Sequence, residues 1–193
     1  MGIKKLILLI SLLFLSLAAQ AGYQLDNAHS SLYFVSIKKD KIGEVHTFEK
    51  LIGSVDDKGV AKVTINLASV KTNIEIRDER MRSLLLETDV FPTANVSVNL
   101  DMESLASVGV GEVTVMPLEL TLDLHGKSKL VQTELQITGL NAGGLLVSTV
   151  KPIMLNAFDF GLGAGIKKLM DVAKLPSIAS AVPVSFNLVF KAN

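Results

Sequence analysis

The amino-acid sequence predicts an all-β protein of about eight antiparallel strands, closed into a barrel or packed as a sandwich. Apolar and polar residues alternate along recurring segments, most clearly at residues 96–102, 118–124, 131–137 and 182–190. Such alternation buries one face of a strand and leaves the other in water, which is typical of antiparallel sheets. Turn-forming residues separate the segments, and a chain of 193 residues that is 49% hydrophobic can build an ordinary core.

Composition and charge exclude several classes of protein. The high apolar content excludes intrinsic disorder. The chain has no cysteine, which excludes disulfides, thiolate nucleophiles and thiolate metal sites. Because 19 basic residues balance 19 acidic ones, we expect no nucleic-acid partner.

Residues 1–21 have the pattern of a secretory signal peptide. The basic pair Lys4-Lys5 precedes an apolar run over residues 6–17, and the segment ends on the small-x-small site Ala19-Gln20-Ala21. The alternatives are a membrane anchor or a buried helix, but a membrane span needs about 20 apolar residues, and this run is shorter. We expect cleavage after this segment, localisation in a bacterial periplasm, and a single domain over residues 22–193 with no membrane span.

Turn residues set the boundaries between the strands. The sequence His125-Gly126-Lys127-Ser128 joins two of the clearest strands and predicts a tight hairpin. The other predicted elements, in chain order, are strands that begin at Tyr23 and Ser31, a turn at residues 56–59, strands over 61–67 and 96–102, a loop at 138–144, a strand over 145–155 and a last strand that ends at Lys191.

Two stretches break the alternation and predict one or two short helices. Residues 76–86 have helical spacing, with Ile76 and Met81 on one apolar face, and Phe91-Pro92 bounds this helix because the residue before proline avoids the helical conformation. Thr72-Asn73 could cap it. Residues 162–173 begin among glycines and predict a short helix or a mobile loop, which could also touch a membrane as a weak amphipathic segment.

The histidines do not form a catalytic pattern. His29, His46 and His125 are scattered, without the spacing of a metal site, and each is best interpreted as a capping or loop residue. His29 with Asp26 and a neighbouring serine has the right residue types for nucleophilic catalysis, but adjacent side chains on a strand point to opposite faces. We therefore expect no enzyme activity and no metal.

A string of short motifs resembles the YceI-like family of bacterial secreted proteins over essentially the whole mature chain. Each motif is weak alone, but their order is specific. The motifs are Tyr23-Gln24-Leu25-Asp26, His29-Ser30, Phe48 with Gly53, Ser69-Val70-Lys71-Thr72-Asn73, Arg77-Asp78 with Met81-Arg82-Ser83, Phe91-Pro92, residues 122–129 and Phe158-Asp159-Phe160-Gly161.

This resemblance implies an eight-stranded, lipocalin-like antiparallel barrel with an apolar interior. It also implies a long-chain lipid as ligand, such as a polyisoprenoid or an isoprenoid quinone, with no other cofactor. Arg77, Asp78 and Arg82 could form a polar collar for a ligand headgroup, or an ion pair that ties the helix to the barrel; the second interpretation is favoured because the motif recurs as family framework.

A ligand tail should lie along the more apolar face of each strand. A one-residue error in register would move a strand's whole set outward. The predicted ligand-binding residues are Leu32, Phe34, Phe48, Ile65, Val98, Leu100, Leu120, Leu122, Leu135, Phe158, Phe186 and Leu188.

Three functions remain open at this point. The first is a periplasmic carrier of a long isoprenoid or similar amphiphile, with pairing as a homodimer left open. The second is a stress-related envelope protein with a filled barrel that acts through its surface. The third is an enzyme that uses the barrel as a pocket, which nothing in the sequence favours.

Overall fold

The computed structural model describes residues 22–193, so the predicted signal peptide lies outside the described residues. This part of the chain forms one sheet of twelve strands. The strands are β1 (Tyr23–Leu25), β2 (Ser31–Lys38), β3 (Ile42–Phe48), β4 (Leu51–Val55), β5 (Val60–Asn66), β6 (Val70–Lys71), β7 (Thr93–Asn99), β8 (Val113–Leu124), β9 (Lys127–Gly139), β10 (Leu145–Thr149), β11 (Ile153–Asn156) and β12 (Ala181–Ala192).

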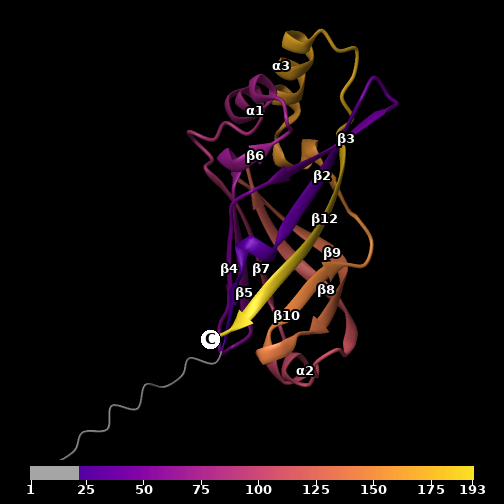
Figure 1. Cartoon of the computed structure of the whole chain (residues 1–193). Coiled ribbons are helices and arrows are strands. Elements are labelled where there is room, and N and C mark those ends of the chain that lie inside the picture. The colour runs from indigo at the N-terminus through magenta and orange to yellow at the C-terminus, as the bar shows by residue number, and fades with distance from the viewer. Residues whose placement is uncertain (1–21) are drawn as a thin grey trace, which may run out of the picture.

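The sheet closes into a barrel through the short strand β1, which pairs with both β12 and β4. The closed ring runs β1-β4-β5-β7-β8-β9-β10-β12, which makes eight strands with antiparallel pairing throughout. Beyond this ring, β2 pairs with the first part of β12, and β3 and β6 extend the wall from there. The prediction of an eight-stranded antiparallel barrel is therefore confirmed (Figure 1).

The hairpin between β8 and β9 forms as its sequence predicts. His125 and Gly126 have φ angles of 51° and 71°, which makes a two-residue turn of the type that matches the twist of hairpin strands. Pairing then continues along both strands, from Leu124 opposite Lys127 to Val113 opposite Thr138.

Two predicted strands end earlier than the alternation suggests. The strand expected over 96–102 ends at Asn99, because the Asp101 carboxylate accepts a hydrogen bond from the Glu103 N–H (3.2 Å) and caps helix α2 (Met102–Ala106). The strand expected over 145–155 is divided into β10 and β11 around Pro152, which has no N–H to donate to a sheet. Both halves still pair with β12.

The helix predicted over 76–86 is present as α1 (Glu75–Arg80) followed by a wider π-helical turn, η3 (Met81–Leu85). The expected cap from Thr72-Asn73 is not observed, because the N-cap residue is Ile74, whose side chain makes no capping hydrogen bond. The segment left open as helix or loop is the helix α3 (Gly163–Ala173).

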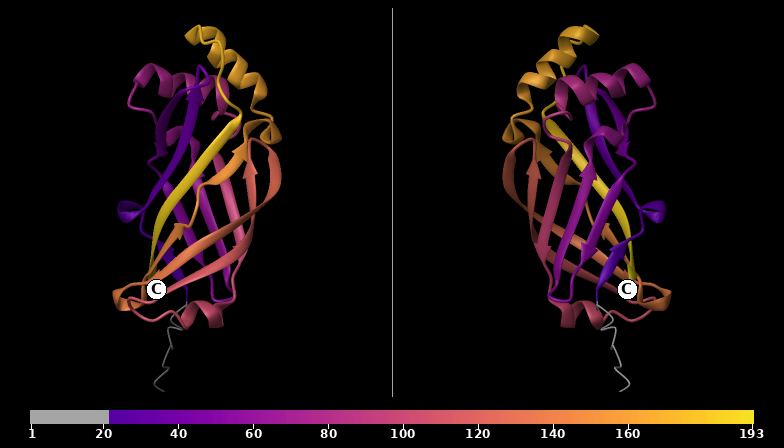
Figure 2. Two further views of the ribbon diagram at one scale, coloured as in Figure 1. Left: turned by 90° about the vertical axis from the view of Figure 1, so that its right-hand side faces the viewer. Right: turned by 90° about the vertical axis from the view of Figure 1, so that its left-hand side faces the viewer.

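The helices lie at the two ends of an elongated barrel, with α1 and α3 at one end and α2 at the other (Figure 2). Within residues 22–193, no helix has both the length and the apolar character that a membrane crossing requires.

Candidate functional site

The barrel encloses a cavity of about 560 Å³, within the range of small-molecule sites. Its wall is made mainly of aliphatic and aromatic side chains from the strands of the ring, from β2 and β3, and from helical segments at both ends of the barrel. The polar exceptions are Ser36, Lys38, Glu44, His46, Arg77 and Arg80.

The strand register explains why the interior is apolar. On β5 and β7, Ala61 faces Val98 and Ile65 faces Ala94 across the ladder, and these residues line the cavity. Val63 and Val96, which are also paired, line the cavity as well. The residues that alternate with these point outward, and there the Thr64 hydroxyl donates to the Asn95 side-chain oxygen at 2.8 Å. The two-residue period of the sequence therefore separates an apolar interior from a polar exterior.

One end of the cavity is closed and the other is open. Leu105 of α2, Leu145 and Phe190 line the end near α2, and each is at most 5% exposed. At the other end, Ile74 and Ile76 line the cavity and yet are 47% and 51% exposed. The cavity therefore opens beside α1. Helix α3 lies at the same end of the barrel (Figures 1 and 2).

All but one of the residues predicted to contact a ligand line this cavity. They are Leu32, Phe34, Phe48, Ile65, Val98, Leu100, Leu120, Leu122, Leu135, Phe186 and Leu188.

The inward orientation predicted for Phe158 is wrong. Its side chain is 59% exposed and does not line the cavity. Residues Ala157–Phe160 form a 3₁₀ helix, η5, in which the Asn156 side chain accepts from the Phe158 N–H at 3.1 Å. A helical turn replaces the two-residue period, so Ala157 and Phe160 face the cavity instead.

The cavity also has lining residues that the strand pattern did not select. Ile137 follows Leu135 by two residues on β9, so the alternation itself could have identified it. Phe160 and Ile166 come from the helical segments η5 and α3, and Leu162 is the residue that precedes α3, so the period-two signal is lost there.

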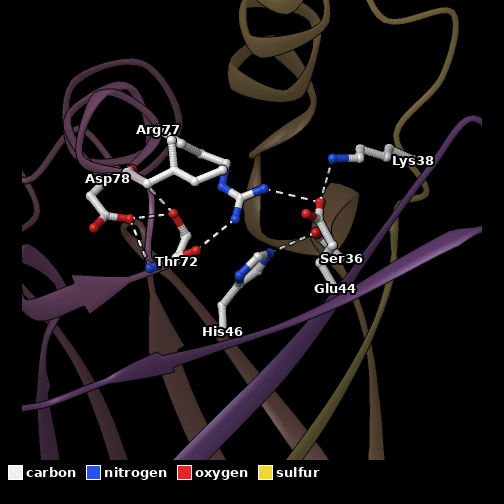
Figure 3. Close-up of polar contacts among 8 residues, drawn as sticks. Ser36, Lys38, Glu44, His46, Thr72, Arg77 and Asp78 are labelled. Carbon is white, nitrogen blue, oxygen red and sulfur yellow. Dashed lines mark hydrogen bonds and ion pairs between the residues drawn. The ribbon is translucent and has the colours of Figure 1, made fainter.

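A group of charged residues lies at the α1 end of the cavity (Figure 3). The Arg77 guanidinium donates through Nη1 to Glu44 Oε2 (3.0 Å) and through Nη2 to the Thr72 carbonyl (2.7 Å). Lys38 Nζ also contacts Glu44 Oε2, at 2.6 Å. These hydrogen bonds from Lys38 and Arg77 lower the pKa of the Glu44 carboxyl.

The predicted ion pair between the helix and the barrel exists, with Glu44 of β3 as the partner of Arg77. Asp78 is 6% exposed, and its carboxylate accepts from the Thr72 N–H (2.8 Å) and from the Thr72 hydroxyl. Arg82 is half-buried and does not line the cavity. Asp78 therefore stabilises the turn before α1, whereas Arg77 both supports that turn and faces the interior.

His46 is a buried residue in the middle of β3, so its interpretation as a capping or loop histidine is wrong. It is 3% exposed, its ring packs 5.2 Å from the Phe34 ring, and its Nε2 shares a hydrogen bond with Ser36 Oγ at 2.8 Å. Burial lowers its pKa, and the nearby Arg77 charge lowers it further. The two-residue period could have revealed this, because Glu44 and His46 share a strand face with Phe48.

Two buried nitrogens at this end of the cavity have no hydrogen-bond partner in the described part of the protein. They are His46 Nδ1 and Arg77 Nε. A buried polar atom without a partner costs about 1–3 kcal/mol, so such atoms are rare in native proteins.

The other two histidines lie away from the cavity and bind different carboxylates. His29 Nδ1 contacts Asp26 Oδ2 at 2.8 Å, and His125 Nε2 contacts Glu87 Oε2 at 3.1 Å. Hydrogen bonds from Lys191 and then His29 lower the pKa of Asp26 to about 2. The hydroxyl of Ser30 donates to the Asp26 carbonyl, so the local set considered for catalysis is not aligned as a nucleophile and base.

Comparison with known proteins finds one family model and three solved structures that are similar to this chain. A family model described as the YceI-like domain matches residues 23–190. A polyisoprenoid binding domain from Saccharophagus degradans, implicated in plant cell wall breakdown, is 38% identical; the match covers 89% of this chain and 98% of that one, with a TM-score of 0.87. BcnA of Burkholderia cenocepacia is 19% identical over 86% of this chain and 98% of its own, with a TM-score of 0.66.

A YceI protein of Campylobacter jejuni shares the fold at 15% identity, with a TM-score of 0.56 over 77% of this chain and 84% of that one. Among curated proteins, none matches this sequence.

Proposed function

The chain belongs to the YceI-like family, and on this premise we propose that it binds a long-chain isoprenoid, or a similar amphiphilic lipid, inside the barrel and carries it in the periplasm. The observation that carries the proposal is the cavity, which is apolar along the barrel, closed at the α2 end and polar near its opening. The similarity to a protein described as a polyisoprenoid binding domain supports the same ligand class.

The energetics favour a long tail over a small ligand. Burying one methylene contributes about 0.8 kcal/mol, so a tail of 15 carbons contributes about 12 kcal/mol before costs. Micromolar binding corresponds to a net binding free energy of about 8 kcal/mol. This is what remains once the cost of the lost translational and rotational freedom has been subtracted from the gain on burial. Because the wall supplies few polar groups along its length, most of the affinity has to come from this apolar burial.

In this proposal the interior binds the lipid and does not catalyse a reaction on it. The polar side chains at the α1 end are an ion-paired group and the Ser36–His46 pair. Although Ser36 Oγ lies 2.8 Å from His46 Nε2, no acceptor among the described residues binds His46 Nδ1 and orients the ring as a base, and we propose no catalytic step. The protein in this proposal delivers or sequesters its ligand unchanged.

Native mass spectrometry of the protein purified from the periplasm tests the proposal. We expect a discrete added mass of several hundred daltons that is lost on denaturation and is identified by solvent extraction. Stripped protein should regain a prenyl compound in stoichiometric amount. A bare polypeptide that takes up no added prenyl chain would refute the proposal and favour a filled barrel that acts through its surface.

Two adjacent residues of β5 offer a matched pair of variants. Val63 lines the cavity, whereas Lys62 is exposed on the outer face. We expect Val63→Trp to lose the bound lipid and Lys62→Trp to retain it, with both variants folded. Because the chain has no tryptophan, each variant also carries a single fluorophore, on opposite sides of the same wall.

A further inference from the structure

Exposed apolar side chains surround the opening of the cavity. Of the residues that line the cavity, three are exposed, namely Ile74 and Ile76 of α1 and Ala173 at the end of α3. Two further apolar side chains of this end are exposed without lining the cavity: Val172 of α3 (46%) and Ile42 in the hairpin between β2 and β3 (38%). The opening therefore lies between the start of α1 and the end of α3, within an apolar rim.

We propose that this end of the protein docks on a membrane that contains anionic lipids, with the cavity open toward the bilayer. The docking surface consists of the tip of the β2–β3 hairpin, residues 39–42, and of residues 163–176, which are α3 and the turn after it. The inference rests on the proposed function, because the bound lipid then passes between bilayer and barrel. A tail held by apolar burial loses that burial in water, so its exchange requires an apolar phase at the opening.

Backbone contacts join the two parts of the docking surface. The Lys39 N–H donates to the Ser177 carbonyl (3.1 Å), and the Ala179 N–H donates to the Ile37 carbonyl (2.8 Å). The Ser177 hydroxyl also donates to Asp40 Oδ1, at 2.7 Å. The hairpin is thus fixed to the segment between α3 and β12, at the end of the barrel opposite α2 (Figure 1).

The docking surface is basic, whereas the closed end of the barrel is acidic. Residues 39–42 and 163–176 contain five lysines and two aspartates. Helix α1, across the opening, has two arginines and three carboxylates and adds no net positive charge. At the closed end, residues 56–59 and 100–112 contain five carboxylates and one lysine. An anionic surface attracts the first end and repels the second, which turns the opening toward the bilayer.

Two of these lysines occupy backbone positions that favour glycine. Lys39 has a φ of 53° in the turn of the hairpin, and Lys174 has a φ of 51° at the C-terminal cap of α3. Glycine or asparagine is common in such turns, and glycine is the usual residue at such a cap. Both lysines are exposed, and neither forms an ion pair with another described residue. Local geometry therefore does not explain lysine at either position, whereas contact with lipid phosphates does.

Sedimentation with vesicles tests the inference on protein that has been stripped of lipid. The vesicles contain phosphatidylcholine alone or phosphatidylcholine mixed with phosphatidylglycerol. We expect binding to the mixed vesicles that weakens as salt is added, and much weaker binding to phosphatidylcholine alone.

The double variant Lys39→Gly with Lys174→Gly removes two charges of the docking surface. Each lysine near an anionic surface contributes about fivefold in affinity, so this variant should bind the mixed vesicles about 25-fold more weakly. Its melting temperature should not fall, because glycine adopts a positive φ readily. Lys58→Gln with Lys62→Gln removes the same charge outside the docking surface and should bind as the wild type does.

Tryptophan at two positions measures the orientation of the docked protein, since the chain has no tryptophan of its own. Val172→Trp places it in the docking surface, and Val115→Trp places it on the outside of β8; the native valines are 46% and 51% exposed. With the mixed vesicles, we expect a blue shift of the emission and quenching by brominated lipid for Val172→Trp. We expect neither change for Val115→Trp.

Several results would overturn the inference. They are equal binding to the two kinds of vesicle, wild-type binding by the double glycine variant, or the same response from both tryptophans. Failure of the proposed function has a different signature. The protein then docks on the mixed vesicles as described, but it takes up no prenyl compound that is added from a water-miscible solvent without vesicles.

Discussion

Replacing Ala61 with leucine should shorten the lipid tail that the cavity accepts. Ala61 lines the cavity on β5, opposite Val98, next to the turn that joins β4 and β5 at the α2 end. A leucine there points into the cavity of about 560 Å³ rather than into a packed layer. Its additional atoms therefore take up space that the end of a long tail would otherwise occupy.

The size of the effect follows from the number of atoms displaced. Leucine has about three more carbons than alanine, so about three ligand carbons lose their place in the cavity. At about 0.8 kcal/mol for each, the loss is about 2.4 kcal/mol, or about 50-fold in affinity. Only tails that reach the closed end should show this loss.

The assay measures the affinity of a series of prenols of increasing tail length. Each prenol is titrated against a fluorescent lipid that it displaces from the protein. Affinity for the wild-type protein should rise with tail length until the cavity is filled. Ala61→Leu should bind the short members normally and stop gaining affinity at a shorter tail. Equal weakening of short and long tails would refute the assignment of the α2 end as the closed end.

Ala94→Leu is the matched control for this experiment. Ala94 lies opposite Ile65, on the same two strands but toward the α1 end, where the cavity opens. A tail of any length passes this position. The control should therefore weaken all chain lengths together, without changing the length at which affinity stops rising.

Three further outcomes concern stability. Asp78→Ala removes the acceptor of the Thr72 N–H and hydroxyl and should lower the free energy of unfolding in urea by about 2–3 kcal/mol; an unchanged midpoint would contradict this role. The pKa of Asp26 is lowered from 3.8 to about 2, so its contribution to stability is complete above the unfolded-state pKa and is lost as pH falls through the folded-state one. Asp26→Asn should accordingly reduce the loss of melting temperature on acidification through that window, and the same loss in both proteins would disprove the linkage. Gly126→Ala places a side chain at φ 71° and should cost about 1 kcal/mol, whereas Gly43→Ala, where a Cβ would lie 3.8 Å from its nearest neighbour, should cost less in the same thermal melts.

Most of the barrel follows from local rules that the sequence displays directly. Side chains alternate across a strand for steric reasons, so the choice of the apolar face places Leu120, Leu122 and Phe186 inside without knowledge of the strand partners. The hairpin at His125-Gly126 is equally local, because two positive φ angles decide the turn. Such features depend on neighbours within a few positions of the chain.

The alternation of inward and outward side chains fails as a guide where the chain leaves the strand conformation and loses the two-residue period. Phe158 was placed inside by alternation, but the Asn156 cap begins a 3₁₀ helix, and Phe160 takes the inner position instead. His46 shows the opposite failure, since the strand period does place it inside, whereas its interpretation as a capping or loop residue ignored that period.

The strand faces and the hairpin follow from the order of the residues, and the family follows from the motifs. The pairing of Arg77 with Glu44, 33 positions away, and the burial of Arg77 Nε and His46 Nδ1 without partners among the described residues depend on the tertiary structure. It also decided which end of the barrel is closed. The physical reason is that these contacts join segments distant in the chain, and their geometry exists only once the sheet has closed and α1 has packed over its end.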